Sequence, residues 1–244
     1  MTSTGLTPTP KLASLLCVVG TDTGVGKTVV GAGLIHGLRE AGVNVVAFKP
    51  VETGLVEGLP PGGEAADWQR LAAVSGQEPR TCLGQSFPLP AAPLAAAREA
   101  GQRVELTQLE SQLQNLRRGR DLVVVEGAGG LCVPFAQDLL WADVIGQWSL
   151  ECLVVGRLGL GTLNHTLLTL ADLDRRKIPA LGVILNTLFT PGPESAQTPV
   201  LIDEFGACPV CGVIPLGCIS PEEVAEVLRS TGLMKRLTSR YKNG

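Results

Sequence analysis

The sequence predicts a single α/β domain built on a mostly parallel sheet with helices on both faces. Short apolar, β-branched runs alternate with segments of helical pattern, as they do when a parallel sheet is buried on both faces. The chain has 244 residues, 45% of them hydrophobic, which is enough for one substantial core. The first apolar run leads through a glycine-rich segment into a helical pattern, a connection typical of this fold class.

Each element of the fold follows from one of these runs. Strands are expected at residues 15–19, 43–48, 122–125, 152–155, 181–185 and 210–214. Helices are expected at residues 27–41, 65–75, 106–118, 139–149, 162–175 and 222–229. Residues 1–13 are rich in Thr and Pro and are expected to form a disordered tail, so the domain is expected to span 14–244. Residues 53–65 are rich in Gly and Pro and are expected to form a mobile loop over the site.

The glycine-rich segment has the residues of a phosphate-binding loop (P-loop). Backbone N–H groups of such a loop face one concavity at a helix N-terminus, Lys27 adds a positive charge, and Thr28 can offer its hydroxyl to Mg²⁺. Five residues separate Gly20 from Gly26, one more than the general P-loop formula has. A tight strand-to-helix turn is the alternative. The segment therefore predicts ATP binding by Asp22, Thr23, Gly24, Val25, Gly26, Lys27 and Thr28.

Polar side chains follow other expected strands at the same edge of the sheet, where ligands of open parallel sheets bind. Lys49 follows the run 43–48, so two cations can flank one phosphate chain. Glu126 follows the run 122–125 and precedes a flexible turn, and Asp67 lies near the start of a helix. With Thr28, these two carboxylates would suffice for Mg²⁺, which keeps several waters. The alternatives are a solvated loop lysine, a turn-stabilising Glu126, and helix charge compensation by Asp67.

Two further features belong to this edge. Asn186 follows the run 181–185, and its amide suits the donor and acceptor edge of a purine, or it caps a turn. Residues 159–166 lead from a strand into a helix without a lysine, which suits a carboxylate. Ordinary helix capping, with His165 as a packed core histidine, is the alternative there.

Composition excludes several classes of partner. The net charge is −3 and no basic run is present, so no nucleic-acid partner is expected. No apolar stretch reaches eighteen residues, so no membrane span is expected. Seven cysteines in apolar surroundings are typical of buried thiols in a reducing cytoplasm. A zinc site at Cys208, Cys211 and Cys218 is disfavoured because it lacks a fourth ligand at suitable spacing.

Taken together, the motifs resemble the dethiobiotin synthetase family. The segments that carry the resemblance run in family order from about residue 15 to 219. They are the glycine-rich segment 20–28, Lys49-Pro50-Val51-Glu52-Thr53-Gly54, Val125-Glu126-Gly127-Ala128-Gly129-Gly130, residues 159–168, Asn186 and Ile214-Pro215. The five-residue spacing of the loop is a feature of this family.

The resemblance implies a homodimer that converts 7,8-diaminononanoate, CO₂ and MgATP into dethiobiotin, ADP and phosphate. By position, Lys27 and the loop hold the phosphates; Thr28, Asp67 and Glu126 surround Mg²⁺; and Lys49 and Thr53 contact the carbamate and γ-phosphate. Adenine is contacted by Asn186 with Pro215, Leu216 and Gly217, and ribose is contacted by Glu222. One further segment corresponds to the part that each subunit contributes to its partner's site, where it receives the carboxylate of the substrate. This segment is Gly161, Thr162, Leu163 and Asn164.

Departures and rivals remain beside this resemblance. Thr53 stands where many members have Ser, Gly24 stands where some have an acid, and residues 82–97 match only loosely. The cobyrinic acid diamide synthetases are the nearest rival, but they need a glutaminase domain for which residues after Asn186 leave no room. Partitioning and septum-positioning ATPases are the rival from another class. Their lysine early in the loop is replaced here by Thr21 or Asp22.

Overall fold

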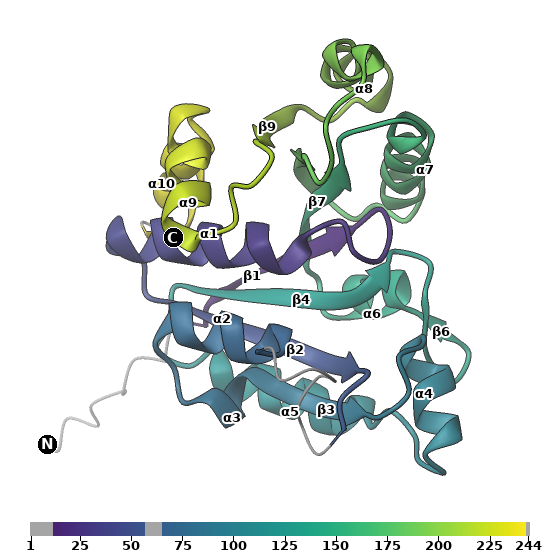
Figure 1. Ribbon diagram of the computed structural model, residues 1–244. Coiled ribbons are helices and arrows are strands. Elements are labelled where there is room, and N and C mark those ends of the chain that lie inside the picture. Colours follow the sequence, from purple (N-terminus) through teal and green to yellow (C-terminus); the bar gives the residue numbers. More distant parts are fainter. Residues whose placement is uncertain (1–11, 57–64, 243–244) are drawn as a thin grey trace, which may run out of the picture.

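A seven-stranded parallel sheet is the centre of the computed structural model, which describes residues 12–56 and 65–242 (Figure 1). In spatial order the strands are β3 (Leu83–Phe87), β2 (Val45–Thr53), β4 (Leu122–Gly130), β1 (Ser14–Gly20), β7 (Glu151–Arg157), β8 (Ala180–Asn186) and β9 (Val210–Ile214). Every neighbouring pair is parallel. A separate antiparallel pair joins β5 (Pro134–Ala136) to β6 (Leu139–Leu140). The predicted fold class is confirmed.

Helices cover both faces of the sheet. The helices packed on one face are α1 (Lys27–Glu40), α2 (Asp67–Ser75), α3 (Pro79–Cys82), α9 (Pro221–Ser230) and α10 (Leu233–Lys242). The other face carries α4 (Pro93–Glu99), α5 (Leu106–Leu116), α6 (Trp141–Gln147) and α7 (Thr162–Arg175). The short turn η1 (Pro193–Ala196) precedes α8 (Thr198–Gly206), which packs on α7. In Figure 1, α1 runs in front of the central strands with α9 and α10 beside it.

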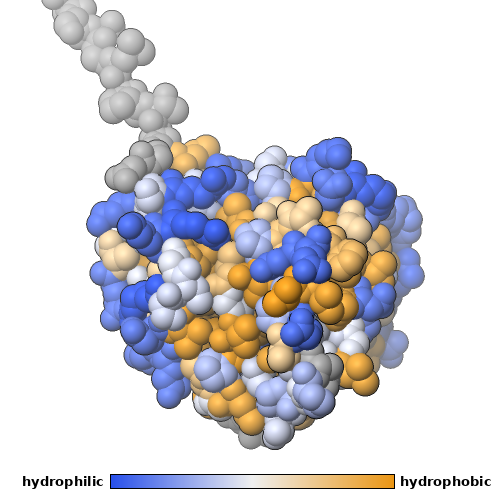
Figure 2. Space-filling model, turned by 90° about the horizontal axis from the view of Figure 1, so that it is seen from above, coloured by the Kyte–Doolittle hydropathy of each residue, from blue (hydrophilic) through white to orange (hydrophobic). Residues whose placement is uncertain are grey.

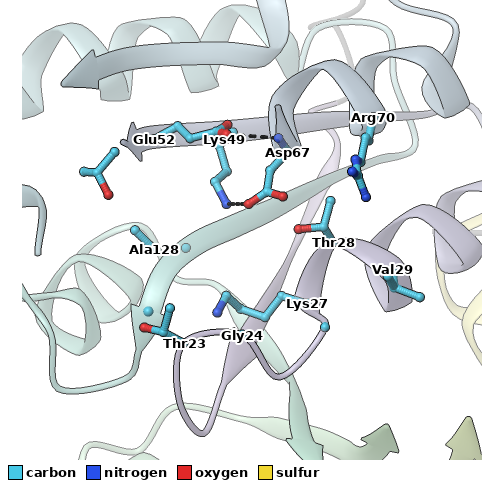
Figure 3. Close-up of a pocket in the computed structure, with 14 residues that line it drawn as sticks. Thr23, Gly24, Lys27, Thr28, Val29, Lys49, Glu52, Asp67, Arg70 and Ala128 are labelled. Atoms are coloured by element: carbon cyan, nitrogen blue, oxygen red, sulfur yellow. Dashed lines mark hydrogen bonds and ion pairs between the residues drawn. The ribbon is translucent and has the colours of Figure 1, made fainter. Parts of the chain in front are cut away.

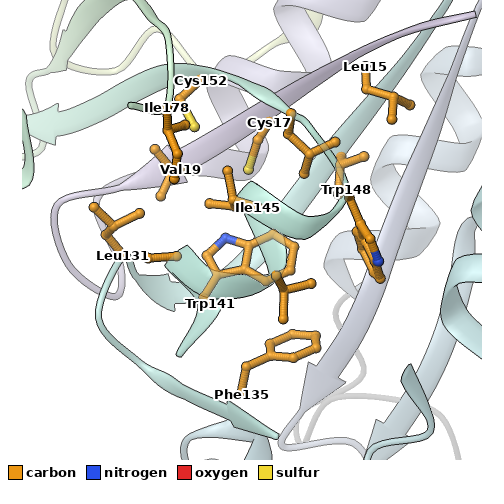
Figure 4. Packing of buried hydrophobic residues seen from close by; sticks show 14 of the residues in the cluster. Leu15, Cys17, Val19, Leu131, Phe135, Trp141, Ile145, Trp148, Cys152 and Ile178 are labelled. Atoms are coloured by element: carbon orange, nitrogen blue, oxygen red, sulfur yellow. The ribbon is translucent and has the colours of Figure 1, made fainter. Parts of the chain in front are cut away.

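The central strand β1 explains why the core has two halves. Leu16 and Val18 point to the α1 side, whereas Cys17 and Val19 point to the α6 side, since side chains alternate along a strand. Aromatic rings fill the second half: the ring of Trp141 lies 4.8 Å from that of Phe135 (Figure 4). The strand is buried on both faces, and this is why it reads as an unbroken apolar run.

Close approach of α9 to α1 depends on a glycine. A Cβ atom on Gly33 would lie 2.3 Å from Cγ1 of Val224 and 3.2 Å from the backbone nitrogen of Ala225. On the same helix, a Cβ on Gly31 would find only ordinary contacts of 3.5 Å. The first contact fixes α9 against the helix that follows the glycine-rich loop.

Several predicted boundaries are wrong, and two of the errors bear on the site. Lys49 and Thr53 belong to β2, and Glu126 with the glycines after it belongs to β4, because both strands extend past their apolar runs. Leu12 and Ala13, expected in the tail, are held by backbone pairing with the turn after α5. The helices and strands that were not predicted are α3, β3, α4, β5, β6, α8 and α10.

Other predicted features fall outside the described residues or need a correction of place. Residues 1–11 of the expected tail and 57–64 of the expected loop lie outside the described part of the chain. The predicted helix 139–149 begins only at Trp141, because Leu139 and Leu140 pair as β6. No helix within residues 12–56 and 65–242 is both long and apolar enough to cross a membrane.

The cysteines are free thiols. Cys208 packs into the core on the α6 side of the sheet and Cys211 into the core on the α1 side, so the two thiols face opposite ways. The two thiols therefore belong to separate halves of the core. The exposed surface also carries apolar groups: Figure 2 shows them gathered near the middle of the upper face, on the side of α8 and α9. Large apolar side chains that are exposed in the described part of the chain include Val200, Phe205, Leu216 and Ile219.

Candidate functional site

A cavity of about 340 Å³ opens at the carboxyl edge of the sheet, between the glycine-rich loop, the ends of β2 and β4, and α2 (Figure 3). Three of its cationic or carboxylate side chains were predicted to meet there: Lys27, Lys49 and Asp67. Glu126 lies directly behind them and is bonded to Lys49. The full lining is Thr23, Gly24, Gly26, Lys27, Thr28, Val29, Lys49, Glu52, Thr53, Asp67, Arg70, Gly127, Ala128 and Gly129.

The glycine-rich loop wraps one side of the cavity and ends at the first residue of α1. Gly24 and Gly26 have φ angles of 71° and 90°, the left-handed region that favours glycine. A Cβ on Gly26 would lie 2.0 Å from Nδ2 of Asn186, so this position also needs glycine for space. The ammonium of Lys27 curls back over the loop and donates to the carbonyl oxygen of Asp22 at 3.2 Å. The Lys27 ammonium therefore lies against the glycine-rich loop at the start of α1.

Lys49 is at the centre of a buried charge network. Its Nζ donates to Oε1 of Glu126 at 2.5 Å and to Oδ2 of Asp67 at 3.0 Å. Its side chain is only 3% exposed, so it is not the solvated loop lysine considered above. Thr28 joins the network by donating from Oγ1 to the same Glu126 oxygen at 2.9 Å. Lys49 of β2 thus lies among two carboxylates, and the Thr28 hydroxyl contacts one of them.

Glu52 fixes the position of the helix that carries Asp67. Its two carboxylate oxygens accept from the backbone N–H groups of Asp67 at 2.9 Å and Trp68 at 3.0 Å. These are the first N–H groups of α2, which lack partners within the helix. A buried carboxylate of β2 therefore caps α2 and sets where the Asp67 side chain points.

The network separates the pKa values of the two lysines. Burial lowers the pKa of Lys27, and the nearby Lys49 charge adds to this, although Glu126 opposes it. Burial also disfavours the Lys49 ammonium, but Glu126, Asp67 and Glu52 outweigh it and raise the Lys49 pKa above its ordinary value. Lys49 thus stays cationic.

The pKa values of two carboxylates, Asp67 and Glu52, shift in opposite directions. Burial opposes ionisation of Asp67, yet the charge and hydrogen bond of Lys49 lower the Asp67 pKa. For Glu52, burial raises the pKa despite the Lys49 charge. Asp67 is therefore ionised while it faces the cavity.

The oxygen atoms in this network fit a hard divalent cation. Thr28, Asp67 and Glu126 offer one hydroxyl and two carboxylates, the oxygen-only donor set that Mg²⁺ takes. Oε2 of Glu126 is buried and has no hydrogen-bond partner in the described part of the chain. Within that part, no three His, Cys, Asp or Glu side chains cluster as a protein-only metal cage. The residues present thus suit an ion that keeps waters or substrate oxygens.

The other predicted site residues lie outside this cavity. Asn186 is 4% exposed, and its Nδ2 donates to the carbonyl oxygen of Val25 at 3.1 Å, so its amide supports the loop from behind. Pro215, Leu216 and Gly217 are exposed after β9, beside the end of β8. Glu222 is exposed and its carboxylate lies 3.8 Å from Nδ1 of His36.

The expected carboxylate-binding segment is separate as well. Gly161 is the N-cap of α7 with a φ of 87° and no side-chain cap, and Leu160 before it is 85% exposed. Asn164 is exposed, whereas Thr162 is buried with an Oγ1 that has no hydrogen-bond partner among the described residues. None of these residues lines the cavity beside Lys27 and Lys49.

Sequence reasoning missed two charged residues of the cavity. Glu52 lies in the segment 49–54 that follows the second apolar run. It was not predicted because its burial on β2 cannot be seen in the sequence. Arg70 stands three residues after Asp67, a spacing that puts both on one face of a helix. That spacing could have identified Arg70.

Comparison with known proteins gives consistent results. A family model described as an AAA domain matches residues 15–217. The ATP-dependent dethiobiotin synthetase BioD of Anaeromyxobacter dehalogenans strain 2CP-C is 44% identical over 73% of this chain and 78% of its own length. The BioD of Aquifex aeolicus is 35% identical over 93% of this chain and 98% of its own. A ParA family ATPase from Chlorobium tepidum shares the fold alone, with a TM-score of 0.54 and 17% identity over 95% of this chain and 98% of that one.

Proposed function

The chain belongs to the ATP-dependent dethiobiotin synthetase family, and from this premise we propose that it carries out the ligase reaction of biotin synthesis in full. In that reaction 7,8-diaminononanoate, CO₂ and ATP give dethiobiotin, ADP and phosphate. The single observation that best supports this proposal is the meeting of Lys27, Lys49 and two carboxylates around the cavity beside the glycine-rich loop.

The proposed chemistry needs no nucleophile from the protein. A neutral amine of the substrate donates its lone pair to CO₂ and then loses a proton, which leaves a carbamate anion. A carbamate oxygen attacks the γ-phosphorus and ADP leaves, which gives a carbamic-phosphoric anhydride. The second amine attacks the carbonyl carbon, loses a proton, and phosphate leaves as the ureido ring closes. Lys27, Lys49 and Thr53 are the side chains at hand to hold these anions.

Position and charge must supply the acceleration in this scheme. Aligned reactants can gain up to about 7–11 kcal/mol, and fixed cations stabilise charge that develops on the transferred group. Lys49 is suited to this role because its carboxylate neighbours hold it protonated. When bound, Mg²⁺ would neutralise charge on the phosphate oxygens, and Thr28, Asp67 and Glu126 are the residues that would hold it.

The remaining assignments rest on sequence position. We propose that residues 22–28 contact the phosphates, that Asn186 and residues 215–217 hold adenine, and that Glu222 contacts ribose. We also propose a homodimer in which Gly161, Thr162, Leu163 and Asn164 receive the substrate carboxylate of the partner's site. The 85% exposure of Leu160, which precedes Gly161, supports this arrangement. Seven free thiols support a cytoplasmic location.

A second candidate function comes from the shared fold of the ParA family ATPase: a nucleotide-switched interaction protein. Thr21 and Asp22, at the loop positions where that class has its early lysine, argue against it. The two candidates differ in what triggers phosphate release. A switch ATPase would release phosphate without the diamine, whereas the synthetase should require both diamine and bicarbonate.

One experiment tests substrate and reaction together. The protein is incubated with diaminononanoate, ¹³C-bicarbonate and MgATP, and the product is analysed by mass spectrometry. A ureido ring that carries one ¹³C atom is the expected result. Phosphate release without any labelled ring would overturn the proposal.

A further inference from the structure

A second hollow, of about 580 Å³, lies at the amino edge of the sheet. It is formed by the start of β2, the turn between α2 and α3, the end of α5 and the segment that leads from α5 into β4. Val46 lines this hollow and Thr53, on the same strand, lines the cavity at the carboxyl edge. The strand between these two residues spans roughly 23 Å. The hollow is therefore separate from the cavity that holds the two lysines.

Three arginines line this second hollow, which we call the arginine hollow. Arg80 comes from α3, and Arg118 and Arg120 come from the segment before β4. Among the lining residues that the structure describes, Glu78 is the one carboxylate. The whole chain has a net charge of −3, so positive charge is concentrated here against the balance of the molecule. A concave surface lined by charges of one sign attracts ions of the other sign.

The fold uses neighbouring arginines but leaves two arginines of the hollow unbonded. Arg39 and Arg117 each donate to a backbone carbonyl oxygen, at 3.0 Å and 2.9 Å. Arg120 donates to the side chain of an asparagine at 2.9 Å. The guanidinium groups of Arg80 and Arg118 are exposed, and within residues 12–56 and 65–242 they have neither a hydrogen bond nor an ion pair. Structural bonds therefore do not account for these two charges.

The side chains of the arginine hollow suit a phosphate group. A guanidinium presents its N–H groups in a fork that matches phosphate oxygens, and a terminal phosphate has enough oxygens for two forks. The amide of Gln112 also lines the hollow, and its buried Oε1 has no hydrogen-bond partner among the described residues, so it can accept from a bound ligand or its water. No aromatic side chain is among the described lining residues to stack on a nucleobase.

We propose that the arginine hollow binds a small anion that carries phosphate groups and no nucleobase, held by Arg80 and Arg118. The arginine hollow and the cavity beside Lys27 share no lining residue in the described part of the chain. The site is therefore distinct from the place where the reaction is proposed to occur, and it can be tested whether or not that reaction takes place.

The probe is radioactive pyrophosphate, and its binding is measured by equilibrium dialysis. The wild type should bind two pyrophosphates per chain, since the glycine-rich loop also binds phosphate groups. Lys27→Met weakens the loop site and should leave one. Adding Arg80→Gln and Arg118→Gln to Lys27→Met should raise the remaining dissociation constant at least about tenfold, because two charge-assisted contacts are lost.

Two further proteins in the Lys27→Met background serve as controls. Arg103→Gln removes the same charge from an exposed side chain that does not line the hollow, and should change the dissociation constant by less than about twofold. Arg80→Lys with Arg118→Lys keeps both charges but not the forks, and should recover part of the affinity. Urea unfolding checks that each protein is folded, and the two single Gln variants give the same comparison if the pair is unstable.

Three outcomes would overturn the proposal. The first is a Lys27→Met protein that binds no pyrophosphate. The second is an equal dissociation constant for the Arg80 and Arg118 variants and for Arg103→Gln. The third is displacement of pyrophosphate from Lys27→Met by ADP at far lower concentration than by unlabelled pyrophosphate, which would assign the hollow to a nucleotide.

Discussion

At the scale of single residues, Lys27 and Lys49 differ in the groups that surround their ammonium groups. In the described part of the chain the Lys27 ammonium donates to the carbonyl oxygen of Asp22, and burial lowers the Lys27 pKa. Lys49 is held by two carboxylates, which raise its pKa. Lys27 is therefore suited to bind an anion, whereas Lys49 is part of the folded charge network. Replacing Lys27 should mainly affect nucleotide binding, and replacing Lys49 should mainly affect stability.

Replacement of Lys27 by Met should abolish tight nucleotide binding without loss of stability. Burial disfavours the Lys27 ammonium, so its removal should leave the midpoint of urea unfolding unchanged or raise it. ADP affinity should fall at least about tenfold, the loss of one strong charge-assisted contact. Calorimetry and urea unfolding measure both. Lys235→Met, on an exposed side chain of α10, is the control. A clear loss of stability in Lys27→Met alone would contradict this reasoning.

Replacement of Lys49 by Met should instead destabilise the protein. The change leaves Glu126 buried beside an apolar side chain, and breaking a buried pair in this way costs about 3–5 kcal/mol. The double variant Lys49→Met, Glu126→Gln should recover much of that loss, because the buried Glu126 charge is removed and Asp67, which also loses Lys49, is 43% exposed to water. Urea unfolding of both variants and of Glu126→Gln completes a double-mutant cycle. Additive effects of the two changes would mean that the pair is not coupled.

The residues that sequence reasoning found and those it missed differ in a physical way. Lys27 and Thr28 lie in a motif whose spacing fixes their chemistry, so they could be predicted. Glu52 acts through the backbone of α2, a contact between segments that no local pattern records. The contact of Asn186 with a purine stays a prediction, whereas the bond from its amide to Val25 depends on how β8 packs beside the loop and has no local sequence pattern.

At the scale of elements, the cap that Glu52 provides links β2 to α2. Glu52→Ala would leave the N–H groups of Asp67 and Trp68 without these partners and cost about 0.5–2 kcal/mol, as for other helix caps. Because α2 carries Asp67, the concentration of Mg²⁺ needed for half-maximal turnover should rise. Glu52→Gln keeps one acceptor oxygen and should shift it less. A magnesium titration of activity checks the order, and equal curves for all three proteins would exclude the linkage.

The contact between α1 and α9 gives a second prediction for elements. Gly33→Ala should destabilise the protein by about 1–3 kcal/mol, since the new methyl group collides with Val224 and overpacks the interface. Gly31→Ala on the same helix meets only ordinary contacts and should gain up to about 1 kcal/mol from helix propensity. Thermal unfolding of the two variants is the measurement. If Gly33→Ala were more stable than the wild type, α9 would be able to move away from α1 at little cost in free energy.

The extent of the elements was only partly predictable. The six long apolar runs became strands because burial on both faces imposes a continuous hydrophobic sequence. β3 was missed because an edge strand with Gly84, Gln85 and Ser86 is half exposed and carries no such signal. β4 runs on through the glycines, and Gly127 is required there because a Cβ would lie 2.2 Å from Nε1 of Trp141.

At the scale of the whole molecule, the pH dependence of stability follows from carboxylates whose pKa values are lowered. Burial opposes ionisation of Asp172 and Asp143, but hydrogen bonds to Asp172 from Arg175 and Arg176, and to Asp143 from the Leu140 N–H and Arg176, outweigh it. The pKa of Asp67 is likewise lowered, because Lys49 outweighs the effect of burial. A lowered folded-state pKa contributes stability that is present above the unfolded value, about 3.9 for Asp, and lost as pH falls through the folded value.

Stability should therefore stay level from about pH 7 to pH 5 and decline below about pH 4. Glu52 acts in the opposite direction, because its pKa is raised: its protonation between the folded and unfolded values offsets part of the loss. Asp172→Asn should flatten the acid decline, since it removes a carboxylate that the folded state binds best when ionised. Urea unfolding at pH 3 to 7 measures the slope for the two proteins. A midpoint that rises on acidification would mean that buried groups such as Glu52 outweigh the ion pairs, and would contradict the balance drawn from the aspartates.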